Sequence, residues 1–129
     1  MGVNFVLIDI EHKRIIVNDI YEPAASFIIE RFNLPSQMDK LTIEISNYDN
    51  DYVIEAIMAY DSENNLRVDL QGVGHGRRIV LSPKEIECSS GAKAGNLPEG
   101  EWILVFKLAL PIPAREWICE YLIQAKAGA

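Results

Sequence analysis

The turn "QGVGHGRR" at residues 71–78 of this 129-residue chain has the residue types and spacing to bind an anion. Three alternate glycines permit positive φ angles and close backbone approach, so the N–H groups of such a turn can line a concavity. His75, Gly76, Arg77 and Arg78 are the candidate ligand-binding residues. The alternative is a bulged connection at the end of a sheet, with the arginines solvated or paired with carboxylates. The turn lacks the GKS or GKT of a phosphate-binding loop.

Oxygen-bearing side chains gather in two further segments, "NYDNDY" at residues 47–52 and "DSEN" at residues 61–64. Carboxylate and amide oxygens are calcium ligands, but the spacing lacks the glycine and the closing glutamate of an EF-hand loop. The competing interpretation is a polar turn whose Asp and Asn side chains cap their own backbone.

Aromatic residues offer a third chemistry, stacking on sugars. Tyr48, Tyr52 and Tyr60 lie near strand ends and are the candidates if they are exposed. Trp102 and Trp117 are expected to face inward, each with a partner for its indole N–H.

Catalysis has little support in this sequence. The two imidazoles, His12 and His75, stand in predicted loops, and a metal site or a general base needs several converging partners. A hydrolytic triad of His75, Asp69 and Ser89 has no supporting spacing, and no nucleophile elbow occurs. We therefore predict no enzyme activity, no catalytic residue, no bound metal and no cofactor.

Charge and composition exclude further partners. With 12 basic and 19 acidic side chains the formal charge is −7, which disfavours nucleic acid and anionic membranes. No window approaches the run of about 18 apolar residues that spans a bilayer, and the first residues do not resemble a secretory signal. Cys88 and Cys119 are too few for a disulfide scaffold, so free thiols in a cytoplasmic protein are expected. The alternative is a single disulfide bridge between the two.

Alternation with period two organises the chain. In "KLTIEISN" Leu41, Ile43 and Ile45 share one face, and in "REWICEYLIQ" Cys119 falls on the apolar face. The run "EWILVFKLAL" is apolar on both faces, as in a central strand covered on both sides. "FVLIDI" and "RIIV" suggest a hairpin whose turn, "EHK", contains His12.

Two segments, "EPAASFIIERF" and "YVIEAIMAY", satisfy both a helical and a strand pattern. We predict strands for both, because turn signals recur at about ten-residue intervals, as in β-sandwiches. The expected fold is a single all-β domain over residues 1–129, an antiparallel, jelly-roll-like β-sandwich of about eight strands. The glycine-rich segment "GAKAGNLPEGEW" is expected to cross from one sheet to the other and to set the register of the Trp102 strand.

The glycine turns resemble those of a known family, the N-terminal β-sandwich domain of bacterial CehA/McbA-type PHP metallohydrolases. "YDSENNLRVDLQGVGHGRR" and "SGAKAGNLPEGEW" stand where that domain has its turns, although Val73, Ala92 and Ala94 replace a tryptophan, a tyrosine and a proline. The matching positions are Asp61, Gly72, Gly76, Arg78, Gly91, Gly95, Leu97, Pro98, Gly100 and Trp102.

The resemblance implies an accessory sandwich, since the metal ligands of such enzymes belong to a catalytic domain with no counterpart here. The predicted function is thus a non-catalytic accessory or protein-interaction domain, whose partner is a hydrolase domain or a second copy of the chain. Apolar residues on both faces of residues 52–60 and 101–108 support this prediction, because one face then needs a cover. The alternative is a module that binds a glycan, calcium or an anion at its glycine-rich loops.

Overall fold

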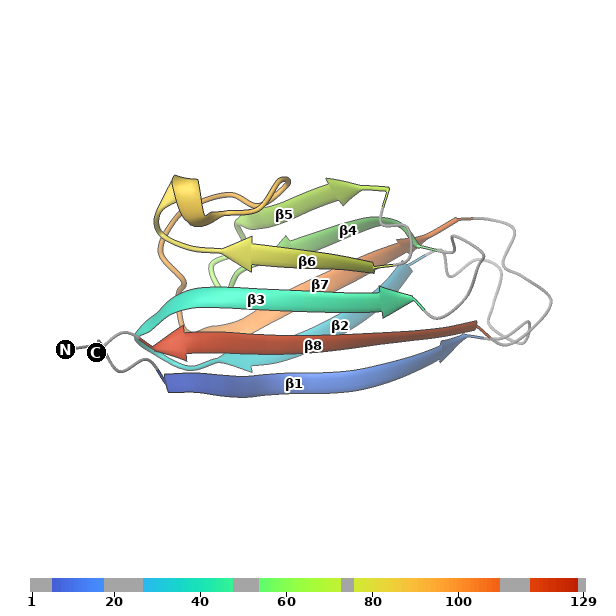
Figure 1. Cartoon of the computed structure of the whole chain (residues 1–129), viewed down its shortest axis with the longest axis horizontal. Helices are drawn as coiled ribbons and strands as arrows, with labels where there is room; N and C mark the ends of the chain where they lie inside the picture. Colours follow the sequence, from blue (N-terminus) through green and yellow to red (C-terminus); the bar gives the residue numbers. More distant parts are fainter. Residues whose placement is uncertain (1–5, 18–26, 48–53, 73–75, 110–116, 128–129) are drawn as a thin grey trace.

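The structure, a computed structural model, describes residues 6–17, 27–47, 54–72, 76–109 and 117–127. Eight strands form two four-stranded antiparallel sheets that pack face to face (Figure 1). The strands are β1 (Val6–Val17), β2 (Phe27–Leu34), β3 (Met38–Asn47), β4 (Ile54–Tyr60), β5 (Leu66–Gln71), β6 (Gly76–Leu81), β7 (Gly100–Leu108) and β8 (Trp117–Ala127). One 3₁₀ turn, η1 (Glu85–Glu87), follows β6.

The strand order is β1-β8-β3-β6 in the first sheet and β2-β7-β4-β5 in the second. Every connection crosses from one sheet to the other except the β4–β5 hairpin. This topology confirms the predicted eight-stranded, jelly-roll-like sandwich.

The core lies between the two sheets, where the alternating side chains of both inner faces meet. Trp102, Tyr121 and Phe106 are the largest fully buried side chains. Leu41, Ile43 and Ile45 are buried as their alternation predicts, and both ambiguous segments are strands where the structure describes them. The side chain of Trp117 lies outside the described part of the chain.

The predicted hairpin near the N-terminus is wrong. Residues 6–17 form one strand, β1, which pairs with β8 along its length. A register irregularity between Asp9 and Glu11 absorbs the change of alternation that suggested a turn. "EHK" also lacks a residue suited to the positive φ angles of a two-residue hairpin turn. His12 therefore lies within a strand, where its Nε2 is 2.6 Å from Glu120 Oε1.

The β6–β7 connection crosses between the sheets, as predicted. At its end, Gly100 has a φ of 119°, which a residue with a side chain rarely adopts. The indole N–H of Trp102 donates to the carbonyl of Pro98 at 2.9 Å, so this tryptophan is the predicted core anchor with a partner. In the described part of the chain, no helix is long and apolar enough to cross a membrane.

Candidate functional site

The structure does not gather the predicted anion-binding residues. His75 lies outside the described residues. Arg77 Nη2 donates to the carbonyl of Gly72 at 2.8 Å, and Arg78 Nε is 3.3 Å from Glu44 Oε1. Because successive strand residues point to opposite faces, these two guanidinium groups do not converge.

Gly76 has a packing reason to be glycine. A Cβ atom at this position would lie 2.9 Å from the carbonyl oxygen of Ile45 on β3. That distance is too short for a real contact, so the glycine lets β6 approach β3. Anion binding by this turn stays a prediction.

Asp61, a candidate calcium ligand, caps its own turn. Its Oδ1 accepts the backbone N–H groups of Glu63 at 2.9 Å and Asn65 at 3.0 Å, and its Oδ2 lies 3.2 Å from Arg67 Nη1. Burial alone would raise the pKa of Asp61, but these hydrogen bonds outweigh it and hold the pKa below its ordinary value. Asp61 therefore matches the alternative to calcium binding at residues 61–64, a polar turn in which the Asp side chain caps its own backbone. Most of the other segment, residues 48–52, lies outside the described residues.

Arg67 joins this turn to the β6–β7 connection. It donates to the carbonyls of Lys93, Gly95 and Asn96 at 3.2, 3.0 and 2.6 Å. Its guanidinium carbon also lies 5.6 Å from the ring centroid of Trp102, a cation–π geometry. Only 5% of the side chain is exposed, so Arg67 holds the fold rather than a ligand.

Cysteine and metal chemistry have no assembled site in the described part of the chain. Cys88 is half-buried and Cys119 is buried, and both thiols are free. Burial, with a smaller effect of the Glu120 charge, raises the pKa of the Cys119 thiol to about 12, so it stays protonated in the core. No three His, Cys, Asp or Glu side chains among the described residues could hold a metal ion together.

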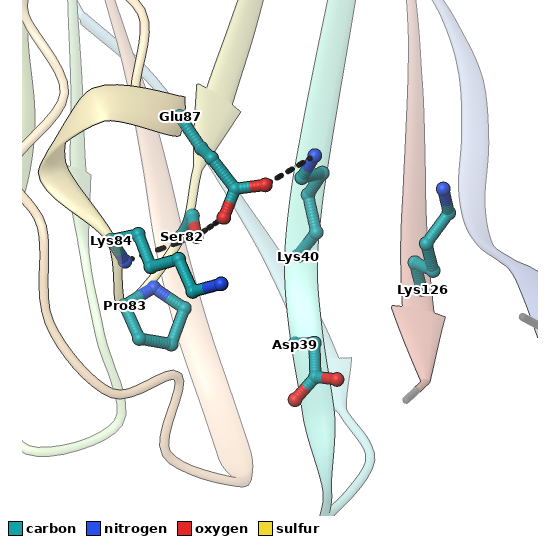
Figure 2. A pocket seen from close by; sticks show the side chains of 7 residues that line it. All are labelled: Asp39, Lys40, Ser82, Pro83, Lys84, Glu87 and Lys126. Atoms are coloured by element: carbon teal, nitrogen blue, oxygen red, sulfur yellow. Dashed lines mark hydrogen bonds and ion pairs between the residues drawn. The ribbon is translucent and has the colours of Figure 1, made fainter. Parts of the chain in front are cut away.

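A groove with three lysines lies on the outer face of the first sheet. This lysine groove has a volume of about 440 Å³ (Figure 2). Its floor is β3 and β8, and its wall is the segment that follows β6. Its lining residues are Asp39, Lys40, Ser82, Pro83, Lys84, Glu87 and Lys126.

Glu87 fixes the groove's wall to its floor. Its carboxylate lies 3.2 Å from Lys40 Nζ and accepts a hydrogen bond from Ser82 Oγ at 3.1 Å. Lys40 and Ser82 hold the pKa of Glu87 below its ordinary value, so the carboxylate stays charged at neutral pH. Ser82 Oγ also accepts the backbone N–H of Lys84 at 3.1 Å. The wall is therefore preorganised.

The second sheet presents a different outer surface, which we call the apolar face. Ile29, Val105 and Met58 are cross-strand partners in one row. Ile103, Tyr60 and Leu66 form the next row, and Phe27 extends the surface on β2. Ile29 is 52% exposed and Phe27 is 46% exposed. Neither the described strands nor η1 forms a third layer over this face (Figure 1).

The outer face of the first sheet is mostly polar by comparison. Gln124 donates to Asp9 at 2.7 Å, and Arg78 pairs with Glu44. A solvated sheet face normally alternates in this way with the buried one. The apolar face departs from that pattern, because β4 and β7 are apolar on both sides. The two-sided pattern was predicted from the sequence, but the expected cover on both sides is not present among the described elements.

Sequence reasoning missed the lysine groove. Lys40 and Lys126 are far apart in the chain and become neighbours only through the β3–β8 pairing. No spacing along the chain could have indicated this. A weaker signal existed in the segment after β6, where Lys84, Glu85 and Glu87 follow Pro83 in a turn.

No protein-family model matches the sequence, and no curated protein matches it. Solved structures resemble its fold. PfGH50B has a TM-score of 0.48 and 9% identity over 99% of this chain, which spans 22% of that chain. The decameric BFDV capsid protein has a TM-score of 0.45 and 9% identity, over 95% of this chain and 98% of that one. TmCBM61 in complex with β-1,4-galactotriose has a TM-score of 0.39 and 10% identity, over 92% and 86%.

At these low identities and TM-scores, the likenesses carry no argument about function. The sandwich fold implied by the resemblance to the PHP accessory domain is confirmed, whereas a relation to PHP enzymes stays a prediction. The chain is a two-sheet antiparallel β-sandwich that resembles carbohydrate-binding modules and viral jelly-roll capsid proteins.

Proposed function

We propose that this chain is a non-catalytic interaction domain that associates through its apolar face with a second copy of itself. The observation that carries the proposal is the continuous row formed by Ile29, Val105 and Met58 across three strands. Exposed contiguous apolar surface is unfavourable in water and commonly marks an interface. Packing a second sheet on it, about 10 Å away, buries it as the sandwich core is buried.

The charges around the apolar face favour a second copy as the occupant. Arg31 and Glu101 pair at 3.5 Å at one end of the apolar face along the strand direction, and Lys107 and Glu55 pair at 3.8 Å near the other end. Each end thus carries both signs, so a copy related by a two-fold axis can place cations opposite carboxylates. Because these four charges are paired, they add little repulsion of their own when two chains of net charge −7 approach each other.

The size of the face indicates weak association. Four strands spaced about 4.8 Å apart, with about six residues each, cover roughly 400 Å² of projected area. Stable dimers bury about 800 Å² of accessible surface per partner. We therefore expect a dissociation constant in the micromolar range or weaker, which sets the concentrations for the test.

Sedimentation equilibrium from about 10 μM to about 1 mM tests the proposal, a range chosen to span weak dimerisation. Ile29→Glu should weaken association at least about tenfold, because it places an unpaired carboxylate in the interface. Ile16→Glu is the matched control, since Ile16 is 49% exposed and lies on β1, the edge strand of the other sheet. It should associate like the unmodified chain.

Two results would contradict self-association through this face. One is a chain that stays monomeric over the whole range, which would favour a different occupant such as the hydrolase domain suggested by the resemblance. The other is an Ile16→Glu variant that loses association as strongly as Ile29→Glu. Circular dichroism of both variants checks that the fold is kept.

A second candidate function is binding of a small ligand in the lysine groove. The preorganised wall and the polar lining favour it.

A further inference from the structure

We infer that the outer edge of β1 pairs with β1 of a second copy, antiparallel and about a two-fold axis at His12. β1 is the last strand of the first sheet, and its inner edge pairs with β8. In the described part of the chain no strand pairs with its outer edge, and Figure 1 shows no described element beyond it. The backbone N–H and C=O groups of that edge can form a ladder with another strand.

The pairing with β8 shows which side chains of β1 share the outer face. These residues alternate with the side chains that face the core, and their partners on β8 have even numbers from Lys126 to Ile118. They are Leu7, Asp9, His12, Arg14 and Ile16.

The irregularity in β1 makes their arrangement symmetric about His12. It adds one residue between Asp9 and His12, which counts as no extra step of the ladder. Asp9 and Arg14 therefore lie two ladder steps to either side of His12, because their partners Gln124 and Glu120 lie two residues to either side of Leu122. By the same count, Leu7 and Ile16 lie four steps to either side.

A two-fold axis at His12 brings complementary side chains together. In an antiparallel pair, residues directly opposite each other lie on the same face, so the axis passes through one residue and its own copy. Asp9 then lies opposite Arg14 of the second copy, and Leu7 lies opposite Ile16. Each contact occurs twice by symmetry. Opposite charges and apolar pairs at such positions both stabilise neighbouring strands.

The apolar contacts cover surface that is exposed in the single chain. Leu7 is 59% exposed and Ile16 is 49% exposed, on a sheet face that is otherwise mostly polar. In the paired strands these two side chains cover each other at both ends of the ladder. Ile8 and Ile15, which pack against the core, lie opposite each other on the inner face.

The neighbouring registers lack this complementarity. With the axis one ladder step away at Lys13, Asp9 lies opposite Ile16, and with the axis at Glu11, Leu7 lies opposite Arg14. Each sets a charged side chain against an apolar one. Without the extra residue in β1, Asp9 and Arg14 would lie on opposite faces and could not meet in any two-fold register. The charges thus make the edge selective for its own copy, because they disfavour pairing with an arbitrary strand.

Pairing through this edge alone should be weak. Two strands on their own are marginally stable in water, and one strand pair buries less than the about 1,600 Å² of a standard interface. We expect a dissociation constant above about 1 mM, beyond the range of the sedimentation test, so Ile16→Glu stays a valid control there. The pairing does not require the apolar face. Together the two surfaces give each chain two different self-interfaces, which can extend dimers into longer assemblies.

Disulfide trapping tests the pairing, because it captures a weak complex. His12→Cys puts the two thiols opposite each other at the axis, where Cβ atoms about 5 Å apart can be bridged after a small adjustment. All variants carry Ile29→Glu, which removes association through the apolar face, and Cys88→Ser, which removes the half-buried thiol. Under mild oxidation His12→Cys should form linked dimer at least about tenfold faster than Ser46→Cys, an exposed control position on β3.

Charge reversal tests the register in the His12→Cys background. Asp9→Arg or Arg14→Asp should each slow the trapping about tenfold, because each creates two contacts between like charges. The double variant, Asp9→Arg with Arg14→Asp, restores opposite charges at both contacts and should restore the rate. Gel electrophoresis without reductant measures the linked dimer, and circular dichroism checks that each variant is folded.

Trapping of His12→Cys no faster than that of Ser46→Cys would overturn the edge pairing. Fast trapping that the single reversals leave unchanged, or that the double variant does not restore, would overturn the inferred register. None of these results bears on association through the apolar face, which the sedimentation of Ile29→Glu tests separately.

Discussion

At the residue scale, Arg67 and Asp61 form a buried ion pair that closes the β4–β5 hairpin onto the β6–β7 connection. Their side chains are 5% and 2% exposed. Such a pair specifies a geometry more than it adds stability, but removing one partner leaves the other charge buried and uncompensated. The three carbonyls that Arg67 also contacts cannot take the place of the Asp61 carboxylate, because they carry no net charge to balance the guanidinium.

Asp61→Asn should therefore lower the free energy of unfolding at pH 7 by about 3 kcal/mol. The effect should depend on pH. Because the pKa of Asp61 is below its ordinary value of 3.8, its ionisation stabilises the fold fully above that pH. This contribution is lost as the pH falls through the lower pKa of the folded state. Urea denaturation between pH 7 and pH 2.5 measures both effects.

The matched control for this variant is Glu101→Gln, which removes a carboxylate from an ion pair in which both side chains are 57% exposed. It should change the free energy of unfolding by less than about 1 kcal/mol. If the Asp61→Asn variant loses as much stability between pH 5 and pH 2.5 as the unmodified chain does, the Asp61 charge does not stabilise the fold as predicted.

At the element scale, β1 is an edge strand tied to the second sheet by a polar contact. The phenol of Tyr121 on β8 donates to Glu30 on β2 at 2.9 Å, and Lys13 on β1 lies 2.7 Å from the same carboxylate oxygen. Burial, and then the neighbouring Glu30, raise the pKa of Tyr121, so the phenol remains a donor. Lys13 also places a charge on the exposed edge, which discourages edge-to-edge pairing with other strands.

Tyr121→Phe should lower the free energy of unfolding by about 2 kcal/mol, the usual value of a hydrogen bond to a charged group. Tyr60→Phe is the control on the outer face of β4 and should change it by less than about 0.5 kcal/mol. Both are measured by urea denaturation at low protein concentration. Equal effects of the two substitutions would exclude a specific role for the contact between Tyr121 and Glu30.

Most of these elements could be predicted from the alternation of apolar and polar residues. In a strand that lies between core and solvent, successive side chains point to opposite faces. Leu41, Ile43 and Ile45 are an example. β1 could not be predicted correctly, because its irregularity near Glu11 breaks the alternation within one strand. The candidate sites were even harder to predict from the sequence. The lysine groove needs the β3–β8 register, and Arg67 gave no signal that its strand position would be buried.

At the scale of the whole molecule, the topology predicts slow folding. Nearly every connection crosses between the sheets, and β1 pairs with β8 from the other end of the chain. Forming such contacts costs the entropy of closing long loops before the contacts stabilise the chain. Folding is therefore slow in sandwiches of this kind.

Refolding after a urea jump should take on the order of 0.1 s or longer. Stopped-flow fluorescence can follow it, because Trp102 is fully buried in the core. The measurement uses the Ile29→Glu variant at low concentration, so that association does not contribute. Complete refolding within a few microseconds would contradict this account of the topology.

The pairing of β1 with β8 also sets how the domain responds to force. Val6 lies opposite Ala127 at one end of these two antiparallel strands. A pull applied to the two strands at this end would load their hydrogen bonds one after another, as in opening a zipper, instead of all together in shear. The sandwich should therefore yield at low tension along this axis, starting at the outermost strand, β1.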